Sequence, residues 1–268
     1  MSATIQKQFN ILAQYARMHW THQLEYKANL AFDIGLRFIE FAVFFYAWQS
    51  ILGANATLPG WDLKGLIVLF SFENVFLALI LSFAWGASNA WEKIARGELD
   101  QYLARPVIPW VMLVGEGMNV APGGWILGIG GLFMAWAFFG FNASISVLLL
   151  IAFMLALAIG ITVFFSLSMS ALSFWMGRVE FTHSLLEGLF EFDQYPQTLF
   201  PWPLQTLTSF TLPFLFASTI PALAILEKIT ADQLILWATV EAGILALNFL
   251  FFSFIWQKGV ERYESFGG

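Results

Sequence analysis

Long apolar runs alternate with short polar segments along most of the chain. A membrane-spanning helix needs about 20 consecutive apolar residues, so the 268 residues fit one membrane domain of about six spans. The predicted spans cover about residues 32–52, 63–87, 110–139, 145–175, 203–226 and 233–256. The pattern therefore predicts an all-α integral membrane protein, with six transmembrane helices in a single domain, residues 1–268.

Residues 1–30 precede the first span and follow a different pattern. Apolar side chains recur every three or four residues, from Ile5 and Phe9 to Trp20 and Leu24, and polar side chains take the opposite face. This periodicity predicts an amphipathic helix that lies in the plane of the membrane interface. The alternative is a soluble helix packed on a partner, which is disfavoured because the sequence shows no other soluble domain.

Glycine and proline interrupt two of the predicted spans. The first half of the third span holds Gly115, Gly117 and Pro122, and we expect a kink or a close helix contact there. The fifth span contains Pro213 and Pro221, neither of which can donate a helical backbone hydrogen bond.

Residues 178–195 are amphipathic, with four acidic side chains set against apolar ones. This many charges makes a poor span, so we place the segment at the cytoplasmic interface. The alternative makes 178–195 a polar fifth span and residues 195–203 a re-entrant turn on the outer side.

The distribution of lysine and arginine predicts the orientation. With both termini, including the polar tail 257–268, and the loop 89–110 in the cytoplasm, nine basic residues lie inside and two, Lys64 and Lys228, lie outside. The nine are Lys7, Arg17, Lys27, Lys93, Arg96, Arg105, Arg178, Lys258 and Arg262. We therefore expect a multi-pass protein of the cell inner membrane with both termini cytoplasmic.

Composition excludes several classes of function. A hydrophobic share of 59% and a mean hydropathy of +0.72 lie outside the range of soluble domains. Cysteine is absent, so no thiolate metal site or cysteine nucleophile exists, and no basic stripe indicates nucleic acid. The chain also lacks a P-loop motif, so any ATP and Mg²⁺ must be bound by another polypeptide. We expect no cofactor in this chain.

The loop 89–110 is dense in charge of both signs, although charged residues are only 11% of the chain. A polar loop of this size between two spans suggests a soluble partner that docks on it. The alternative is a solvated loop without a partner. The charged residues are Glu92, Lys93, Arg96, Glu98, Asp100 and Arg105.

Within this loop the residue order predicts a short helix. Gly97 breaks the helix that leaves the membrane, and Asp100 favours the N-terminus of a new one. Tyr102 and Leu103 would give the new helix an apolar knob, and Pro106 ends it. Such a helix, parallel to the membrane, can seat in a groove of another protein.

The loop resembles the I-x-x-G-x-L-D-x-x-L-x-R-P signature of a subfamily of type-2 ABC exporter permeases. Further patches resemble that family in the same order along nearly the whole chain. They are Tyr195-Pro-Gln-Thr-Leu-Phe-Pro-Trp-Pro-Leu, Thr211-Leu-Pro-Phe, Ile220-Pro-Ala and the terminal Trp256-Gln-Lys-Gly-Val-Glu-Arg-Tyr-Glu-Ser-Phe-Gly.

The resemblance implies a six-span permease subunit that pairs with a second copy or a sister permease in the lipid bilayer. It also implies two copies of a separate cytoplasmic ATPase, an interfacial N-terminal helix, and a coupling helix between spans two and three. Members of the family are mostly exporters of lipids, drugs or peptides. The predicted ATPase-coupling residues are Gly97, Leu99, Asp100, Tyr102, Leu103, Arg105 and Pro106.

Ionisable residues inside the spans are candidates for a substrate path. Asp33 and Arg37 are four residues apart in the first span, and we expect them to pair. Glu73 in span two and Glu241 with Asn248 in span six lie deeper, where they could line a path for a cationic or polar group. Hydrogen bonding between helices is the alternative for these three.

Two other classes of function compete with the permease. A stand-alone secondary carrier, or the substrate-capture subunit of a vitamin importer, also has about six spans, but neither needs the charged loop. A membrane-embedded enzyme is disfavoured because no predicted span contains a histidine. His19 and His22 are one turn apart on the N-terminal helix, without a nearby third ligand for a metal.

Overall fold

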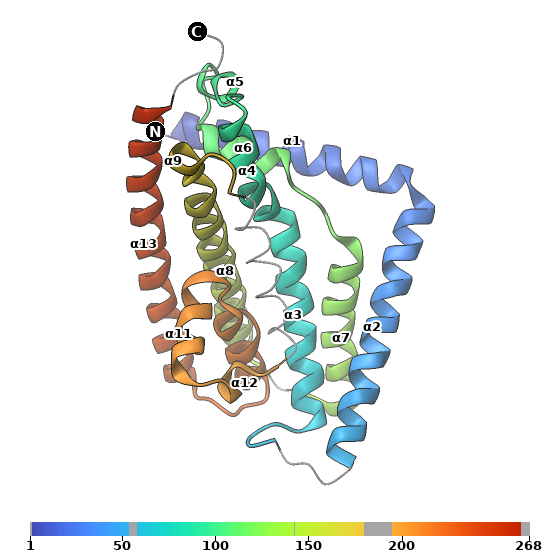
Figure 1. Ribbon diagram of the computed structural model, residues 1–268. Helices are drawn as coiled ribbons and strands as arrows, with labels where there is room; N and C mark the ends of the chain where they lie inside the picture. The colour runs from blue at the N-terminus through green and yellow to red at the C-terminus, as the bar shows by residue number, and fades with distance from the viewer. Residues whose placement is uncertain (1, 54–57, 142, 180–194, 264–268) are drawn as a thin grey trace.

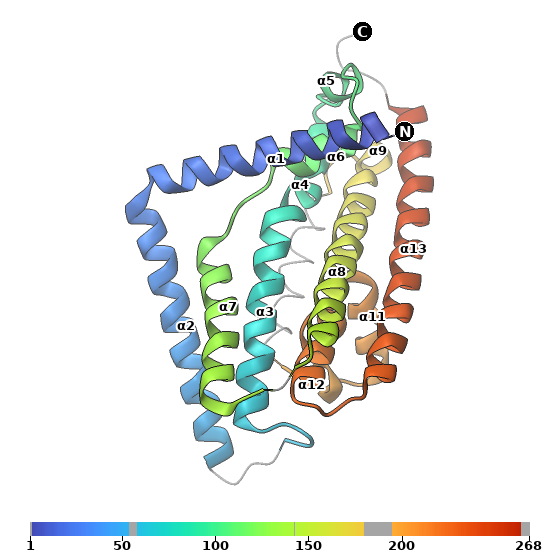
Figure 2. The same cartoon turned by 180° about the vertical axis from the view of Figure 1, so that it is seen from behind.

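A bundle of long helices forms the body of the molecule, and one helix, α1, lies across one end of it (Figures 1 and 2). The computed structural model describes residues 2–53, 58–141, 143–179 and 195–263. The helices are α1 Ser2–Glu25, α2 Lys27–Gly53, α3 Leu63–Phe83, α4 Trp85–Ala95, α5 Asp100–Leu103, α6 Pro109–Glu116, α7 Pro122–Phe139, α8 Ile145–Ala171, α9 Ser173–Met176, η1 Gln197–Leu199, α11 Trp202–Thr211, η2 Leu215–Thr219, α12 Ile220–Ile225 and α13 Ala231–Arg262.

The all-α class is confirmed, and the spans are confirmed in part. Four helices of the described chain are long and apolar enough to cross a membrane, namely Leu63–Ala95, Pro122–Phe139, Ile145–Met176 and Ala231–Arg262. A fifth candidate is the bent pair formed by α11 with η2 and α12. Helix α2 has 27 residues and runs beside α7 in both views (Figures 1 and 2), but its three charged residues in mid-helix lower its hydropathy.

Helix α1 has the exposure expected of an interfacial helix. It runs across the end of the bundle, at a large angle to α2 (Figure 2). Phe9, Trp20 and Leu24 are exposed on it, whereas Tyr15 packs against Gly115 of α6. The exposed apolar face is the one predicted to enter the membrane interface.

The third predicted span, 110–139, is broken in its first half, where its glycines and proline predicted a kink or a close helix contact. The chain forms α6, leaves the helical conformation after Gly117, and starts α7 at Pro122. Pro122 has no backbone N–H to continue α6 and suits the first turn of a new helix. Ala121 before it adopts a left-handed conformation with φ 44°, which redirects the chain.

The predicted fifth span, 203–226, is sharply bent. Helix α11 and the segment Leu215–Ile225 meet at an angle of 89°. At the turn, the Phe214 ring packs edge-on against Phe76 of α3, at 5.6 Å between centroids. Before the pair, the Trp61 indole nitrogen donates to the Thr198 hydroxyl at 3.0 Å, near the start of α3. The pair therefore enters the bundle from the end opposite α5 and returns to that same end (Figure 1).

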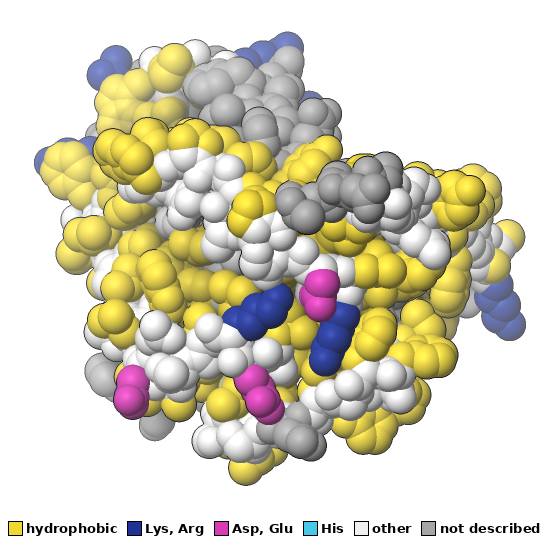
Figure 3. Space-filling model, turned by 90° about the horizontal axis from the view of Figure 1, so that it is seen from below, with side chains coloured by type: hydrophobic (Ala, Val, Ile, Leu, Met, Phe, Trp, Pro, Cys, Tyr) yellow, Lys and Arg dark blue, Asp and Glu magenta, His cyan; other side chains and the backbone are white. Residues whose placement is uncertain are grey.

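That opposite end carries both basic and acidic side chains. Figure 3 looks at it directly and shows them among apolar and other uncharged side chains. Lys228 donates to the Gly60 carbonyl at 2.7 Å and lies 4.0 Å from Asp62. The basic residues of α1, α4 and the end of α13 lie at the other end, with α5 (Figure 1). Most of the segment 178–195, predicted to be amphipathic, falls on residues 180–194, outside the described part of the chain.

Helix α3 forms the centre of the bundle and packs most closely on α7. Most of its residues are buried, and small residues of α7 let the two backbones approach. A Cβ atom on Gly128 would lie 2.6 Å from Val75 Cγ2 and 2.7 Å from the Val75 backbone nitrogen. A Cβ atom on Gly130, two residues along, would meet nothing within 4 Å.

This contrast gives a matched pair of variants. We expect Gly128→Ala to destabilise the bundle by about 2 kcal/mol, because the α3 backbone blocks the added methyl group. Gly130→Ala should be neutral or slightly stabilising, since alanine favours the helix. The melting temperature of the detergent-solubilised protein, followed by tryptophan fluorescence, measures both. Equal melting temperatures for the two variants would contradict the close α3–α7 contact.

Candidate functional site

The segment from α4 to α6 projects beyond the bundle as a hairpin with α5 near its tip (Figures 1 and 2). Gly97 ends α4 with φ +71°, a conformation that suits glycine. The Glu98 N–H donates to the Lys93 carbonyl at 2.9 Å, and the Gly97 N–H donates to Ile94 at 3.2 Å. These two bonds form a Schellman motif, which reverses the chain directly after the helix.

A close backbone crossing anchors this hairpin to itself. A Cβ atom on Gly117 would lie 2.3 Å from the Gly86 Cα atom, and one on Gly86 would lie 2.4 Å from the Val114 carbonyl oxygen. Only glycine permits this approach, so α4 and α6 are locked together at their membrane end. Ser170 of α8 donates to the Ala87 carbonyl at 2.7 Å and ties the crossing to the bundle.

A polar network fills the inner side of the hairpin. The Tyr102 hydroxyl donates to Glu116 Oε2, and Lys93 Nζ lies 3.1 Å from Glu98 Oε2 and 3.6 Å from Glu116 Oε1. Burial of Tyr102, together with its bond to the Glu116 carboxylate, raises the pKa of the phenol, so the hydroxyl keeps its proton. The network joins α4, α5 and α6 through Lys93, Tyr102 and Glu116.

The predicted apolar knob of Tyr102 and Leu103 is therefore wrong for Tyr102. Its side chain is only 3% exposed, whereas Leu103 is 39% exposed. Neighbouring positions on a helix point about 100° apart, so the two side chains cannot share one face.

The predicted coupling residues thus divide into two groups. Gly97, Leu99 and Tyr102 shape and hold the hairpin from inside, and Leu99 is fully buried. The outward side presents an acid, an apolar side chain, a cation and a proline: Asp100, Leu103, Arg105 and Pro106. Their coupling role stays a prediction.

The C-terminal segment also holds the loop, which the sequence did not indicate. The Leu99 N–H donates to the Tyr263 hydroxyl at 3.1 Å, and the Tyr263 ring packs edge-on against Phe174. Phe174 fits over Gly259, where a Cβ atom would lie 2.0 Å from its ring. Gly259 and Tyr263 are four residues apart, which places them on one side of the end of α13. That spacing was the available signal, but the sequence did not reveal what they contact.

The candidate path residues lie on two helices that α8 separates (Figures 1 and 2). Glu73 is buried on α3, and Glu241 and Asn248 are buried on α13. The Asn248 amide donates to Ile244 of its own helix at 3.2 Å. Among the described residues, neither oxygen of the Glu241 carboxylate has a hydrogen-bond partner. The substrate path stays a prediction.

The ion pair predicted in the first span is confirmed. Arg37 Nε lies 4.0 Å from Asp33 Oδ1, and its guanidinium also bonds Glu40 at 2.8 Å. Asp33 accepts from the Gly123 N–H at 3.1 Å, at the positive end of α7. These charges join α2 to α7. Within the part of the chain that the structure describes, no three metal-ligating side chains come together.

These features define a membrane-embedded protein with apolar spans and a charged projection at one end. The family model described as "ABC-2 family transporter protein" matches residues 38–267, and the chain belongs to this family. The match covers the hairpin and the C-terminal contact with it. Membership implies a membrane transport component that works with a partner ATPase. No curated protein and no solved structure matches the chain.

Removal of one hydroxyl tests the C-terminal contact. Tyr263→Phe keeps the ring on Phe174 but removes the acceptor for the Leu99 N–H. We expect backbone hydrogen exchange of the 97–103 peptide to rise about fivefold, because one hydrogen bond contributes about 1 kcal/mol. Mass spectrometry measures this exchange. Tyr46→Phe, at an exposed position on α2, is the control and should leave the peptide unchanged. Unchanged exchange in Tyr263→Phe would show that the contact does not hold the loop.

The buried carboxyl of Glu241 gives a stability test. Replacement by leucine removes a buried polar group to which no described residue offers a hydrogen bond, and such a group costs about 1–3 kcal/mol of stability. We expect Glu241→Leu to raise the melting temperature by a few degrees, since about 1 kcal/mol shifts it by 2–4 °C at this size. A lowered melting temperature would mean that the carboxyl is bonded in the native protein.

Proposed function

We propose that this chain is the permease subunit of an ATP-driven exporter energised by a separate cytoplasmic ATPase. The permease pairs with a second copy or a sister permease, and each half receives one of two ATPase copies, which bind ATP and Mg²⁺. The site of coupling is the outward side of the hairpin, formed by Asp100, Leu103, Arg105 and Pro106. Lipids, drug-like molecules or peptides are the substrate classes that the resemblance favours.

The observation that carries this proposal is a stiff charged projection with an exposed apolar side chain. Helix α5 has four residues, too few to be stable alone, so its shape depends on the hairpin below it. The Schellman turn, the Tyr102–Glu116 bond and the Tyr263 contact all fix it from inside. A solvated loop without a partner would have no use for such a framework, and neither would a stand-alone carrier.

The contacts also indicate how a push on α5 would travel. Helix α4 continues directly from α3, with a break only at Ala84, so a displacement of the hairpin tilts the central helix. The glycine crossing makes α6 follow α4, and the Tyr263 contact couples α5 to α13. ATPase closure would thus act on α3 and α13 together, and alternating access would open a cavity between the two permease halves.

A six-span topology is part of the proposal. The proposal assigns five crossings to α2, α3 with α4, α7, α8 and α13, of which all except α2 are long and apolar enough by themselves. In this proposal the sixth crossing falls between α8 and α13, which run in the same direction (Figure 1). The basic residues near α1, α5 and the end of α13 favour a cytoplasmic location for that end and for both termini, in the inner membrane.

A pull-down tests the proposal. The tagged permease, extracted in mild detergent, should co-purify with an ABC ATPase and support its turnover. The variant Asp100→Arg with Leu103→Glu changes only exposed side chains, so we expect it to stay folded and to lose most of the bound ATPase. A matched control, Gln101→Ala with Ala104→Ser, changes α5 and its C-cap residue without a change of charge.

Two results would contradict the proposed function. One is the absence of any co-purified ATPase under conditions in which the permease stays folded. The other is full retention of the ATPase by the double variant, which would make a stand-alone carrier the better-supported function.

A further inference from the structure

A hollow with an apolar lining lies between α2 and α7, near the end of the bundle opposite α5 (Figure 1). Its volume is about 440 Å³. Ile67 of α3 and Ala135 of α7 are buried at its floor, whereas Met134 and Phe138 at its rim are exposed. The hollow therefore opens sideways, towards the surface that the bilayer surrounds. The lining residues are Phe41, Phe45, Ile67, Met134, Ala135, Phe138 and Phe139.

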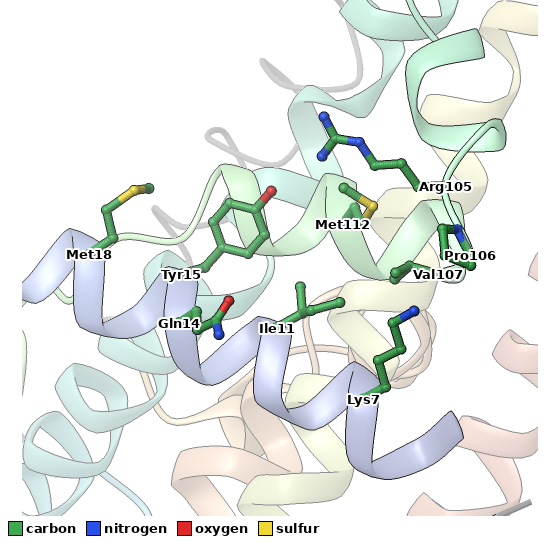
Figure 4. Close-up of a pocket in the computed structure, with 9 residues that line it drawn as sticks. All are labelled: Lys7, Ile11, Gln14, Tyr15, Met18, Arg105, Pro106, Val107 and Met112. Carbon is green, nitrogen blue, oxygen red and sulfur yellow. The ribbon is translucent and has the colours of Figure 1, made fainter. Parts of the chain in front are cut away.

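A hollow at the other end of the molecule provides a contrast. It lies between α1 and the segment after α5 and has a similar volume, about 410 Å³, but its lining includes Lys7, Gln14 and Arg105 (Figure 4). Water can occupy a polar space of this kind, whereas an apolar hollow stays dry. An unfilled space between α2 and α7 would lose dispersion contacts. Within a bilayer, a lipid acyl chain is the group that suits its lining.

A cation lies at the end of this hollow that is farther from α5. Lys64 precedes Ile67 by three residues, so the two side chains share a face of α3. The Lys64 ammonium lies 5.8 Å from the centroid of the Phe139 ring, which lines the hollow, and 4.8 Å from that of Phe141. Aromatic rings attract a cation but do not neutralise its charge. Among the described residues, no carboxylate forms an ion pair with Lys64.

Lys64 is one of the two basic residues that the proposed orientation places on the outer side, where lysine is disfavoured. The other, Lys228, helps to hold the fold. It donates to the Gly60 carbonyl, lies near Asp62 and places its ammonium 5.7 Å from the centroid of the Trp61 ring. A positive charge held beside an apolar hollow, at the edge of a bilayer, has the chemistry that binds the phosphate of a lipid.

We propose that the hollow between α2 and α7 binds one anionic phospholipid, with an acyl chain in the hollow and the phosphate on Lys64. The chain would lie along the helices, and the headgroup would stand where α3 begins and α7 ends. From Met134 to Phe139 the hollow extends about 7.5 Å, so it holds the part of the chain nearest the headgroup. A net negative headgroup is favoured because a zwitterionic lipid brings its own cation beside the phosphate.

The test uses the full-length permease in nanodiscs with two photoactivatable lipids, a phosphatidylglycerol and a phosphatidylcholine. Both have the same acyl chains, with a diazirine in the part nearest the headgroup. We expect the phosphatidylglycerol to label residues 134–139 about five times as strongly as the phosphatidylcholine, because one lysine favours an anionic lipid by about this factor. Mass spectrometry of the labelled peptides measures both.

Variants assign the preference to one side chain. Lys64→Gln should remove it, so that the two lipids label α7 equally, and Lys64→Arg should keep it. Lys258→Gln, near the other end of the molecule, is the matched control and should leave the labelling of α7 unchanged. Leu236 and Val240 of α13 are exposed at the same end of the bundle as Lys64, and Lys64→Gln should leave their labelling unchanged.

Salt gives a test that needs no variant. High ionic strength should reduce the preference of the wild-type permease for phosphatidylglycerol, because the contact with the headgroup is electrostatic. This measurement decides the matter even if Lys64→Gln fails to fold. A preference that high salt leaves intact would contradict a phosphate contact with Lys64.

Three further results would overturn the inference. Equal labelling of α7 by the two lipids in the wild-type permease would indicate ordinary boundary lipid only. Label on α13 without label on α7 would mean that another surface, such as that of a second permease copy, covers the hollow. A preference that survives in Lys64→Gln would place the phosphate elsewhere. The proposal requires only that the chain crosses a bilayer, so the ATPase pull-down tests the proposed function separately.

Discussion

The contact between the Gly86 and Gly117 backbones is the constraint on which the rest of the functional end depends. Helices α4 and α6 can cross this closely only because neither position has a side chain. The crossing sets the angle at which the hairpin leaves the bundle, and the Ser170 bond fixes its position relative to α8. Without it, α5 would have no fixed place from which to meet a partner.

The short helix α5 is stable only because the residues around it stabilise it. Four residues cannot offset the cost of nucleating a helix, so the flanking structure must supply the difference. Tyr102 and Leu99 are buried against this flanking structure. The Tyr102 hydroxyl donates to Glu116, and the Leu99 N–H donates to the Tyr263 hydroxyl. The surface is thereby left to Asp100, Leu103 and Arg105, whose side chains do not hold the fold and are available for recognition.

The sequence predicted what depends on local pattern. Hydrophobic runs defined the helical class, the period of residues 5–24 indicated α1, and Gly97 and Pro106 framed α5. It did not predict what depends on distant contacts. Tyr102 points inward because its hydroxyl donates to Glu116 of α6. The Tyr263 hydroxyl accepts from Leu99, a residue far from it in the sequence. The bend in the predicted fifth span arises where Phe214 meets Phe76, and prolines alone do not specify whether a helix kinks or turns back.

The corner between α1 and α2 has a mechanical consequence. Only Tyr26 separates the two helices, and the Leu30 N–H donates to its carbonyl at 3.0 Å, so the joint has little freedom. The pair behaves as a bent lever whose horizontal arm, 24 residues at 1.5 Å each, is about 36 Å long. A vertical shift of about 3 Å at the far tip of this arm corresponds to a rotation of about 5°. Through a stiff elbow, the same rotation would swing α2 within the bilayer.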